Sequence, residues 1–250
     1  MTESIGRKFW KLTQNKYLPE SPQRLGIPQP PLELEYDLAA PLIKLPDMAD
    51  VTKPTVSLWE AIDRRITVRR YSEASLSLAE LSLLLWVTQG VKEVTARPVT
   101  LRTVPSAGAR HAFETFLLVN RVDGLEPGIY RYIALEHALL AFDLSADANQ
   151  RITEASKNQQ QIANSAVTFL WAAVTERMTW RYPERGFRYM LLDAGHVCQN
   201  LYLAAEGIGC GVCAIAAYDD ELLNQAVKLD GEQIFICYGA SLGKRTVVVE

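Results

Sequence analysis

The sequence lacks several features that would assign it to a broad class of proteins. Its formal net charge is only −3 over 250 residues, so charge gives no reason to expect nucleic acid or an anionic membrane as a partner. No apolar run is long enough to cross a bilayer, because the nearest, residues 190–207, carries Asp193, His196 and Glu206. No apolar stretch follows the early basic residues, so the N-terminus does not predict a signal peptide.

Cysteine is scarce, and its four copies (198, 210, 213 and 237) all fall in the last quarter of the chain. This usage favours a reduced, cytoplasmic protein. Cys210 and Cys213 have the spacing of redox pairs and zinc sites, but no second such pair exists and both lie in an apolar run. We favour a structural role and expect no metal; a redox pair and a metal site are the alternatives.

Proline is concentrated near the N-terminus, with eight of twelve at positions 19, 22, 28, 30, 31, 41, 46 and 54. This density argues against regular helix or a central strand. We therefore predict an extended arm over residues 1–54 and a folded domain over residues 55–250. Because aromatic residues such as Trp10 and Tyr36 are available to dock, we favour an arm that wraps over the body or over a second subunit, rather than a disordered leader.

Regular structure is predicted from residue 55 onward. Two capping boxes, Ser57–Glu60 and Ser77–Glu80, predict the starts of two helices. Further helices are predicted over 147–161, 188–206 and 220–227, and strands over 113–120, 129–133, 138–144, 166–175, 211–217 and 234–242. The helix over 188–206 has apolar residues nearly all round and is expected to be buried. This order predicts an α+β fold with an antiparallel or mixed sheet flanked by helices.

Two segments carry the chemistry. The basic segment, residues 64–71, has the sequence Arg-Arg-Ile-Thr-Val-Arg-Arg-Tyr, and its local excess of cations indicates a bound anion. The Pro-Ser turn, residues 105–108, has the sequence Pro-Ser-Ala-Gly, in which small residues let backbone N–H groups approach a flat ligand. Together they suggest the two halves of a flavin site.

Further motifs follow in order over roughly residues 55–245. They include the Pro-Ser turn with Ala109 and His111, the Leu-Asp-Ala-Gly-His run at 192–196, Gly-Ile-Gly-x-Gly at 207–211, and Gly243-Lys244. The combination resembles the nitroreductase-like flavin oxidoreductases. Within them it is most similar to the SagB-type dehydrogenases associated with thiazole/oxazole-modified peptides. The resemblance implies a nitroreductase-like fold and a homodimer that binds FMN at the subunit interface and transfers hydride at flavin N5.

The resemblance also implies which residues bind the cofactor. Its pattern sets Arg65, Thr67 and Arg69 on the FMN phosphate, although Ile66 stands where relatives often have a basic residue; a solvated helix end is the alternative. The remaining cofactor residues are the Pro-Ser turn (Pro105, Ser106, Ala107 and Gly108), His111, Ala214, Lys244 and Arg245. We interpret His196 and Gln199 as a hydrogen-bonded buried pair, either structural or near the flavin or partner subunit.

Arg181 and Tyr182 are the candidate catalytic residues. Azoline-oxidising relatives have Lys-Tyr here, and an arginine cannot act as the base that a lysine can. The interpretation is an FMN-dependent dehydrogenase of SagB type acting on a small molecule or peptide, with azoline-to-azole oxidation weakened by Arg181. The alternatives are an NAD(P)H-dependent nitro or quinone reductase, a flavin-binding scaffold without activity, and a dimeric interaction protein without cofactor.

Overall fold

The centre of the protein is one antiparallel sheet. The structure is a computed structural model that describes residues 3–246. The strand order in this part of the chain is β1-β6-β5-β4-β7-β9-β8, and every neighbouring pair is antiparallel. Its strands are β1 (Leu42–Lys44), β4 (Phe113–Val119), β5 (Gly128–Ile133), β6 (Ala138–Asp143), β7 (Val167–Val174), β8 (Cys210–Ile215) and β9 (Ile234–Lys244). A separate hairpin joins β2 (Val91–Val94) to β3 (Thr100–Arg102).

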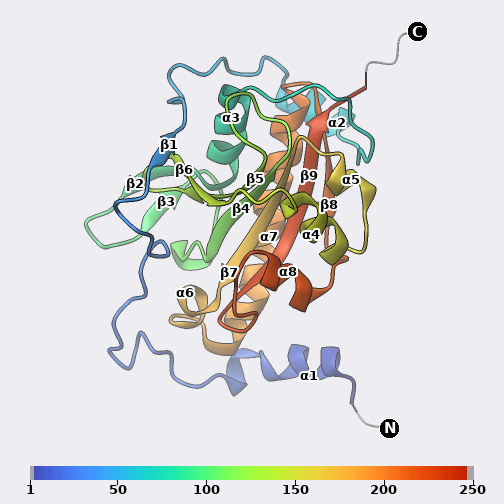
Figure 1. The fold of residues 1–250 in the computed structure, drawn as a ribbon. Helices are drawn as coiled ribbons and strands as arrows, with labels where there is room; N and C mark the ends of the chain where they lie inside the picture. Colours follow the sequence, from blue (N-terminus) through green and yellow to red (C-terminus); the bar gives the residue numbers. More distant parts are fainter. Residues whose placement is uncertain (1–2, 247–250) are drawn as a thin grey trace.

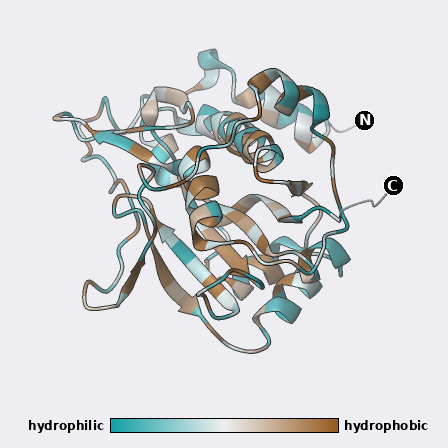
Figure 2. Cartoon of the chain, turned by 90° about the horizontal axis from the view of Figure 1, so that it is seen from above, coloured by the Kyte–Doolittle hydropathy of each residue, from teal (hydrophilic) through white to brown (hydrophobic). Residues whose placement is uncertain are grey.

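Helices cover both faces of the sheet (Figure 1). On one face lie α3 (Leu78–Gln89) and α7 (Gly186–Glu206), and on the other lie α4 (Ala148–Ala155), α5 (Gln160–Ala163) and α8 (Asp220–Ala226). Consequently every residue of the middle strands β4 and β7 is buried. Figure 2 shows hydrophobic colouring along these central strands. A strand covered on both faces favours apolar residues, and β7 is apolar apart from Thr168. β4 also buries Glu114 and Thr115, and Glu114 is paired with arginines.

The remaining elements are short. They are α1 (Ile5–Leu12), α2 (Leu58–Arg64), α6 (Thr175–Thr179) and three 3₁₀ turns, η1 (Asn15–Tyr17), η2 (Ala107–Ala109) and η3 (Pro183–Arg185). Both predicted capping boxes are confirmed, since Ser57 and Ser77 each accept a hydrogen bond from the N–H three residues on, at 3.2 Å. Among residues 3–246, no helix combines the length and hydrophobicity that crossing a bilayer requires.

Two expectations about helices need correction. Residues 5–12 form a helix, because the first proline is at position 19 and leaves the segment before it free to coil. The helix expected over 147–161 is split into α4 and α5, because Lys157 and Asn158 adopt positive φ angles of 57° and 56°. Such angles do not continue a right-handed helix.

The N-terminal arm runs along the outside of the same chain from α1 to β1 (Figure 1). A buried ion cluster holds its middle. Glu114, on β4, forms ion pairs with Arg177 at 2.6 Å and with Arg131 at 3.7 Å, and all three side chains are at most 7% exposed. The same carboxylate accepts a hydrogen bond from Leu34 N at 2.9 Å, and Arg177 Nε donates to Pro31 O at 2.9 Å. The backbone of the arm therefore hydrogen-bonds to the charged side chains of Glu114 and Arg177, which are buried in the folded domain.

We predict that Glu114→Gln lowers the free energy of unfolding by about 3–5 kcal/mol, because it leaves two buried guanidinium groups without their counter-ion. Urea unfolding measures the loss. The matched control is Glu136→Gln, which removes the exposed ion pair with Lys44 and should cost less than about 1 kcal/mol. Equal losses in the two variants would contradict a stabilising role for the cluster.

Candidate active site

The Pro-Ser turn is held by a carboxylate from α7. Ser106 Oγ donates to Asp193 Oδ2 at 2.6 Å, and Ala107 N approaches Asp193 Oδ1 at 3.4 Å. Ser106 Oγ also accepts from His111 N at 2.9 Å. Burial raises the pKa of Asp193, and the bonds from Ser106 and Ala107 oppose that rise. The Ser106 hydroxyl thus orders the turn within the chain, with Pro105 and Gly108 exposed beside it.

Gly108 lies against the predicted catalytic pair. It has φ +58°, and a Cβ placed on it would lie 2.5 Å from Tyr182 Oη and 3.1 Å from Arg181 Cδ. A larger residue would push against the Tyr182 hydroxyl and would adopt a backbone conformation that glycine takes up most readily. The Tyr182 ring is further fixed by an edge-on contact with Tyr189, at 4.9 Å between ring centroids. The structure therefore brings together Gly108, Arg181 and Tyr182, which the sequence separates by more than seventy positions.

The basic segment leaves α2 and runs beside β8. Val68 N donates to Val212 O at 2.9 Å. Tyr202, on α7, contacts both the basic segment and β8. Its hydroxyl lies 3.3 Å from Thr67 Oγ1 and accepts a hydrogen bond from Ala214 N at 2.9 Å. The Arg65 guanidinium lies 5.4 Å from the centre of the Tyr202 ring. Tyr202 is not predictable from the sequence, because no motif marks it and only the packing of α7 on β8 reveals its position.

Lys244 and Arg245 lie at the same edge but already have partners. Lys244 Nζ pairs with Glu80 and donates to Ile208 O at 2.9 Å. Arg245 pairs with Glu206, and its Nε donates to Cys210 O at 3.1 Å. The backbone at this point is continuous with the basic segment, because Ser72 N donates to Lys244 O at 2.9 Å. Arg65 and Arg69, in contrast, form no ion pair with a carboxylate in the described part of the chain.

The two groups of residues lie at different points of α7. Asp193 holds the Pro-Ser turn and Tyr202 holds the basic segment, nine residues or roughly 13 Å further along the helix. Just before Asp193, α7 exposes Leu191 and Leu192, which are 59% and 61% exposed, and between Asp193 and Tyr202 it exposes Gly195, His196 and Gln199. This corrects two expectations: α7 is not buried all round, and His196 and Gln199 are not a buried pair. An apolar helix surface does not reveal from sequence whether its own chain covers it.

The two cysteines with paired spacing do not form a redox or metal pair here. Cys210 and Cys213 are three apart on β8, so their side chains point to opposite faces of the sheet. Both are free, and burial raises the pKa of each thiol, that of Cys210 to about 12. These buried, protonated thiols have the environment of structural cysteines.

His111 is buried, and its backbone rather than its ring contacts the Pro-Ser turn. Burial, with the Arg102 and Arg110 cations nearby, lowers the pKa of His111 to about 3. The ring is therefore neutral at pH 7 and cannot donate a proton as an imidazolium there. Its φ of 42° is unusual for a residue other than glycine.

This burial predicts a pH-dependent stability. The contribution of neutral His111 is fully present above pH 6.5 and is lost as the pH falls towards 3, because the unfolded chain takes up the proton first. Between pH 7 and pH 5 the loss should be about 2 kcal/mol. Asparagine tolerates the positive φ, so His111→Asn should remove this part of the pH dependence of the free energy of unfolding, measured with urea. His196→Asn, at an exposed position, should leave that pH dependence unchanged. The same pH dependence of stability in the wild type and both variants would refute this role of His111.

Comparison with known proteins assigns the family. The model of the family described as "Nitroreductase family" matches residues 62–244. MJ1384 of Methanocaldococcus jannaschii, a protein provisionally named a nitroreductase, is 34% identical over 187 residues, covering 75% of this chain and 89% of that protein. A crystal structure from Ralstonia eutropha, provisionally titled a nitroreductase, superposes with a TM-score of 0.68 at 20% identity and covers 85% of this chain and 93% of that one.

Two further relatives are named for peptide processing. They are the trifolitoxin-processing protein TfxB of Rhizobium leguminosarum bv. trifolii (29% identical over 52% of this chain and 36% of TfxB) and the microcin B17-processing protein McbC of Escherichia coli (25% over 52% and 49%). A chain of the E. coli microcin synthetase McbBCD complex with truncated pro-MccB17 bound superposes with a TM-score of 0.61 at 18% identity, covering 97% of this chain and 92% of that one. The resemblance found in the sequence is thus confirmed, and the chain belongs to the nitroreductase family.

Proposed function

We propose that the protein is an FMN-dependent oxidoreductase of SagB type that acts as a homodimer in the cytoplasm. Members of the family are generally flavin-dependent oxidoreductases. The observation that carries the proposal is the contact of Gly108 with Tyr182 and Arg181, because it joins a flat, small-residue surface to an ionisable pair. FMN, when bound, supplies hydride exchange at its N5 atom.

The donor set of the basic segment fits the phosphate of FMN. Arg65 and Arg69 each present a guanidinium fork, and Thr67 presents a hydroxyl between them. Alternate residues of an extended segment share a side, which suits three donors to one anion. We assign Lys244 and Arg245 a weaker role, because Glu80 and Glu206 neutralise them. Ala214 would pass its backbone along the ring, held through its N–H by Tyr202.

At the other end, the Pro-Ser turn would offer backbone and hydroxyl groups to the ring. Tyr182 would hold or transfer a proton at its hydroxyl oxygen, which faces Gly108. Arg181 would stabilise negative charge beside it. An arginine cannot accept a proton from a substrate at neutral pH, so this chain is poorly equipped for the base-assisted oxidation of an azoline.

Two substrate classes therefore remain within the proposal. One is an azoline ring on a peptide, supported by the relatives TfxB and McbC. The other is a nitro or quinone compound reduced at the expense of NAD(P)H, supported by Arg181 in place of lysine. Rapid bleaching of the flavin by NADH or NADPH favours the second. A flavin-loaded protein without turnover, in tight complex with another protein, would instead be a scaffold subunit.

The first experiment is the visible spectrum of the purified protein, with mass identification of any chromophore released on denaturation. We predict that the protein releases FMN and that the double variant Arg65→Ala/Arg69→Ala loses at least about tenfold in FMN affinity, because two charge-assisted contacts are removed. Arg70→Ala, at the exposed alternate position, is the matched control and should retain FMN.

Unchanged FMN content in the double variant would overturn the assignment of the phosphate site. A colourless protein that takes up no added FMN would overturn the flavoenzyme proposal as a whole and favour the interaction protein without cofactor.

The homodimer is supported by exposed apolar residues on α2, on the segment just after it and on α7, and the two helices pack together. These residues are more than half exposed: Leu58, Trp59, Ile62, Ile66, Leu191 and Leu192. Gly195 has open space above it, so another backbone could approach α7 closely. Such a surface, bordered by both halves of the candidate site, is typical of an interface between subunits.

We predict that the wild type is a dimer and that Leu192→Glu shifts it to a monomer, because a charge enters this apolar surface. Light scattering coupled to size exclusion measures the mass. Leu222→Glu provides the control, since Leu222 is 51% exposed on α8, which covers the opposite face of the sheet. A monomeric wild type would end the homodimer proposal.

A further inference from the structure

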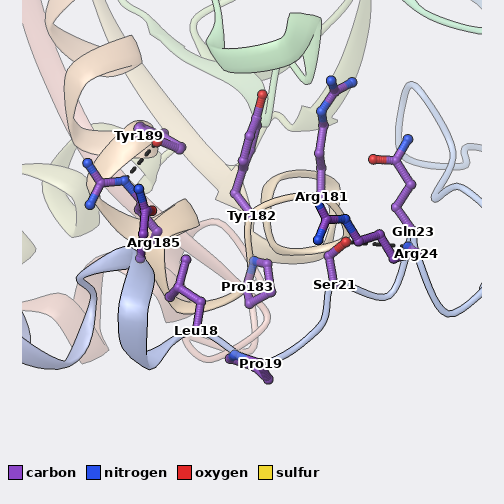
Figure 3. Close-up of a pocket in the computed structure, with 11 residues that line it drawn as sticks. Leu18, Pro19, Ser21, Gln23, Arg24, Arg181, Tyr182, Pro183, Arg185 and Tyr189 are labelled. Carbon is purple, nitrogen blue, oxygen red and sulfur yellow. Dashed lines mark hydrogen bonds between the residues drawn. The ribbon is translucent and has the colours of Figure 1, made fainter.

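A cavity of about 560 Å³ lies between the N-terminal arm and the candidate catalytic pair (Figure 3). This volume is in the range of small-molecule sites. Arg181, Tyr182 and Arg185 line it from the body, whereas Ser21, Gln23 and Arg24 line it from the arm. Because Tyr182 also contacts the Pro-Ser turn, the cavity opens beside the atoms to which we assign chemistry.

The arm is anchored on both sides of this cavity. Before it, Arg185 Nη1 donates to Thr13 O at 3.1 Å. After it, Gln23 N donates to Trp180 O at 2.9 Å, and Trp180 Nε1 donates to Ile27 O at 2.8 Å. The wall that carries Arg24 is therefore a fixed part of the structure.

The cavity is positively charged without compensation. Three arginines line it, and none of its lining residues is Asp or Glu. Among residues 3–246, no ion pair joins Arg24, Arg181 or Arg185 to a carboxylate. Behind them lies Arg110, whose pKa is lowered by burial and by the cations Arg181, Arg177 and Arg97. In a chain of net charge −3, a group of guanidinium groups that have no carboxylate partner favours a bound anion.

We infer that this cavity binds the substrate through an oxyanion, a carboxylate or a phosphate, held by Arg24 of the arm together with Arg181 and Arg185. That the bound anion is the substrate of a flavin reaction rests on the proposed function; that the cavity binds an anion does not. Planar guanidinium forks match the two oxygens of either group. We assign specificity to Arg24, because it lies on the arm and belongs to neither the Pro-Ser turn nor the basic segment. The arm thus supplies a wall of the substrate site.

The probes are benzoate and its neutral analogue benzamide, with binding measured by calorimetry on the full chain. Wild type should bind benzoate at least about tenfold more tightly than benzamide. Arg24→Gln should remove most of that preference, and Arg24→Lys should retain part of it. Arg7→Gln, on the exposed face of α1, is the matched control and should keep it. Equal binding of the two probes, or an unchanged preference in Arg24→Gln, would overturn the inference.

Reactivity gives a second measurement. The protein is reduced with dithionite under anaerobic conditions, and its reoxidation is followed with 4-nitrobenzoate and 4-nitrobenzamide. Arg24→Gln should slow only the reaction with the carboxylate, at unchanged FMN content. The source of the anion is separated by competition: displacement of benzoate by inorganic phosphate, and by NADPH better than NADH, would assign the oxyanion to nucleotide phosphate.

Failure here is distinguishable from failure of the proposed function. A protein without flavin that prefers benzoate, dependent on Arg24, would support the anion site and refute the flavoenzyme. A flavin-loaded protein that does not distinguish the charged from the neutral member of either probe pair would support the flavoenzyme and refute the anion site.

Discussion

The hydrogen bonds between Asp193 and the Pro-Ser turn constrain the rest of the candidate site. A carboxylate buried on α7 is costly unless donors satisfy it, and Ser106 and Ala107 supply them. Because the turn is fixed to the helix, Gly108 is fixed against Tyr182. Tyr202 repeats the arrangement further along the same helix, with Thr67 and Ala214 as its partners. One helix therefore sets the positions of both halves of the site, and its packing against the sheet sets the position of the helix.

The arginines of this chain divide by their partners. Arg131 and Arg177 share the buried carboxylate of Glu114 and fasten the arm. Arg65, Arg181 and Arg24 have no such carboxylate in the described residues. A guanidinium that already has its counter-ion stabilises the fold and has little left for a ligand, whereas an unpaired one in a cavity retains its attraction for an anion. This distinction, rather than the number of basic residues, separates structural from binding roles.

The parts of the fold predictable from sequence are those that local rules determine. The capping boxes at Ser57 and Ser77, and the buried middle strands β4 and β7, follow from the chemistry of neighbouring residues. Other features depend on contacts between distant parts of the chain. The role of Tyr202 arises only when α7 packs on β8, and the exposure of Leu192 depends on where the other elements end. The place of Arg24 in the cavity is of the same kind, because prolines mark the arm as extended without determining its path.

Arg181 connects these observations. The resemblance to azoline-oxidising dehydrogenases implies a lysine at this position, and a lysine can be made neutral by burial and then accept a proton. An arginine gives up that ability and instead carries a permanent charge with a planar fork of donors. Here Arg181 lines a cavity together with Arg24 and Arg185, and no carboxylate is among its lining residues. Arg181 and the arm therefore both favour anion binding over proton abstraction. We propose that this site has an anion-binding pocket beside Tyr182 where a lysine would supply a base. The tyrosine hydroxyl is then the group that exchanges protons.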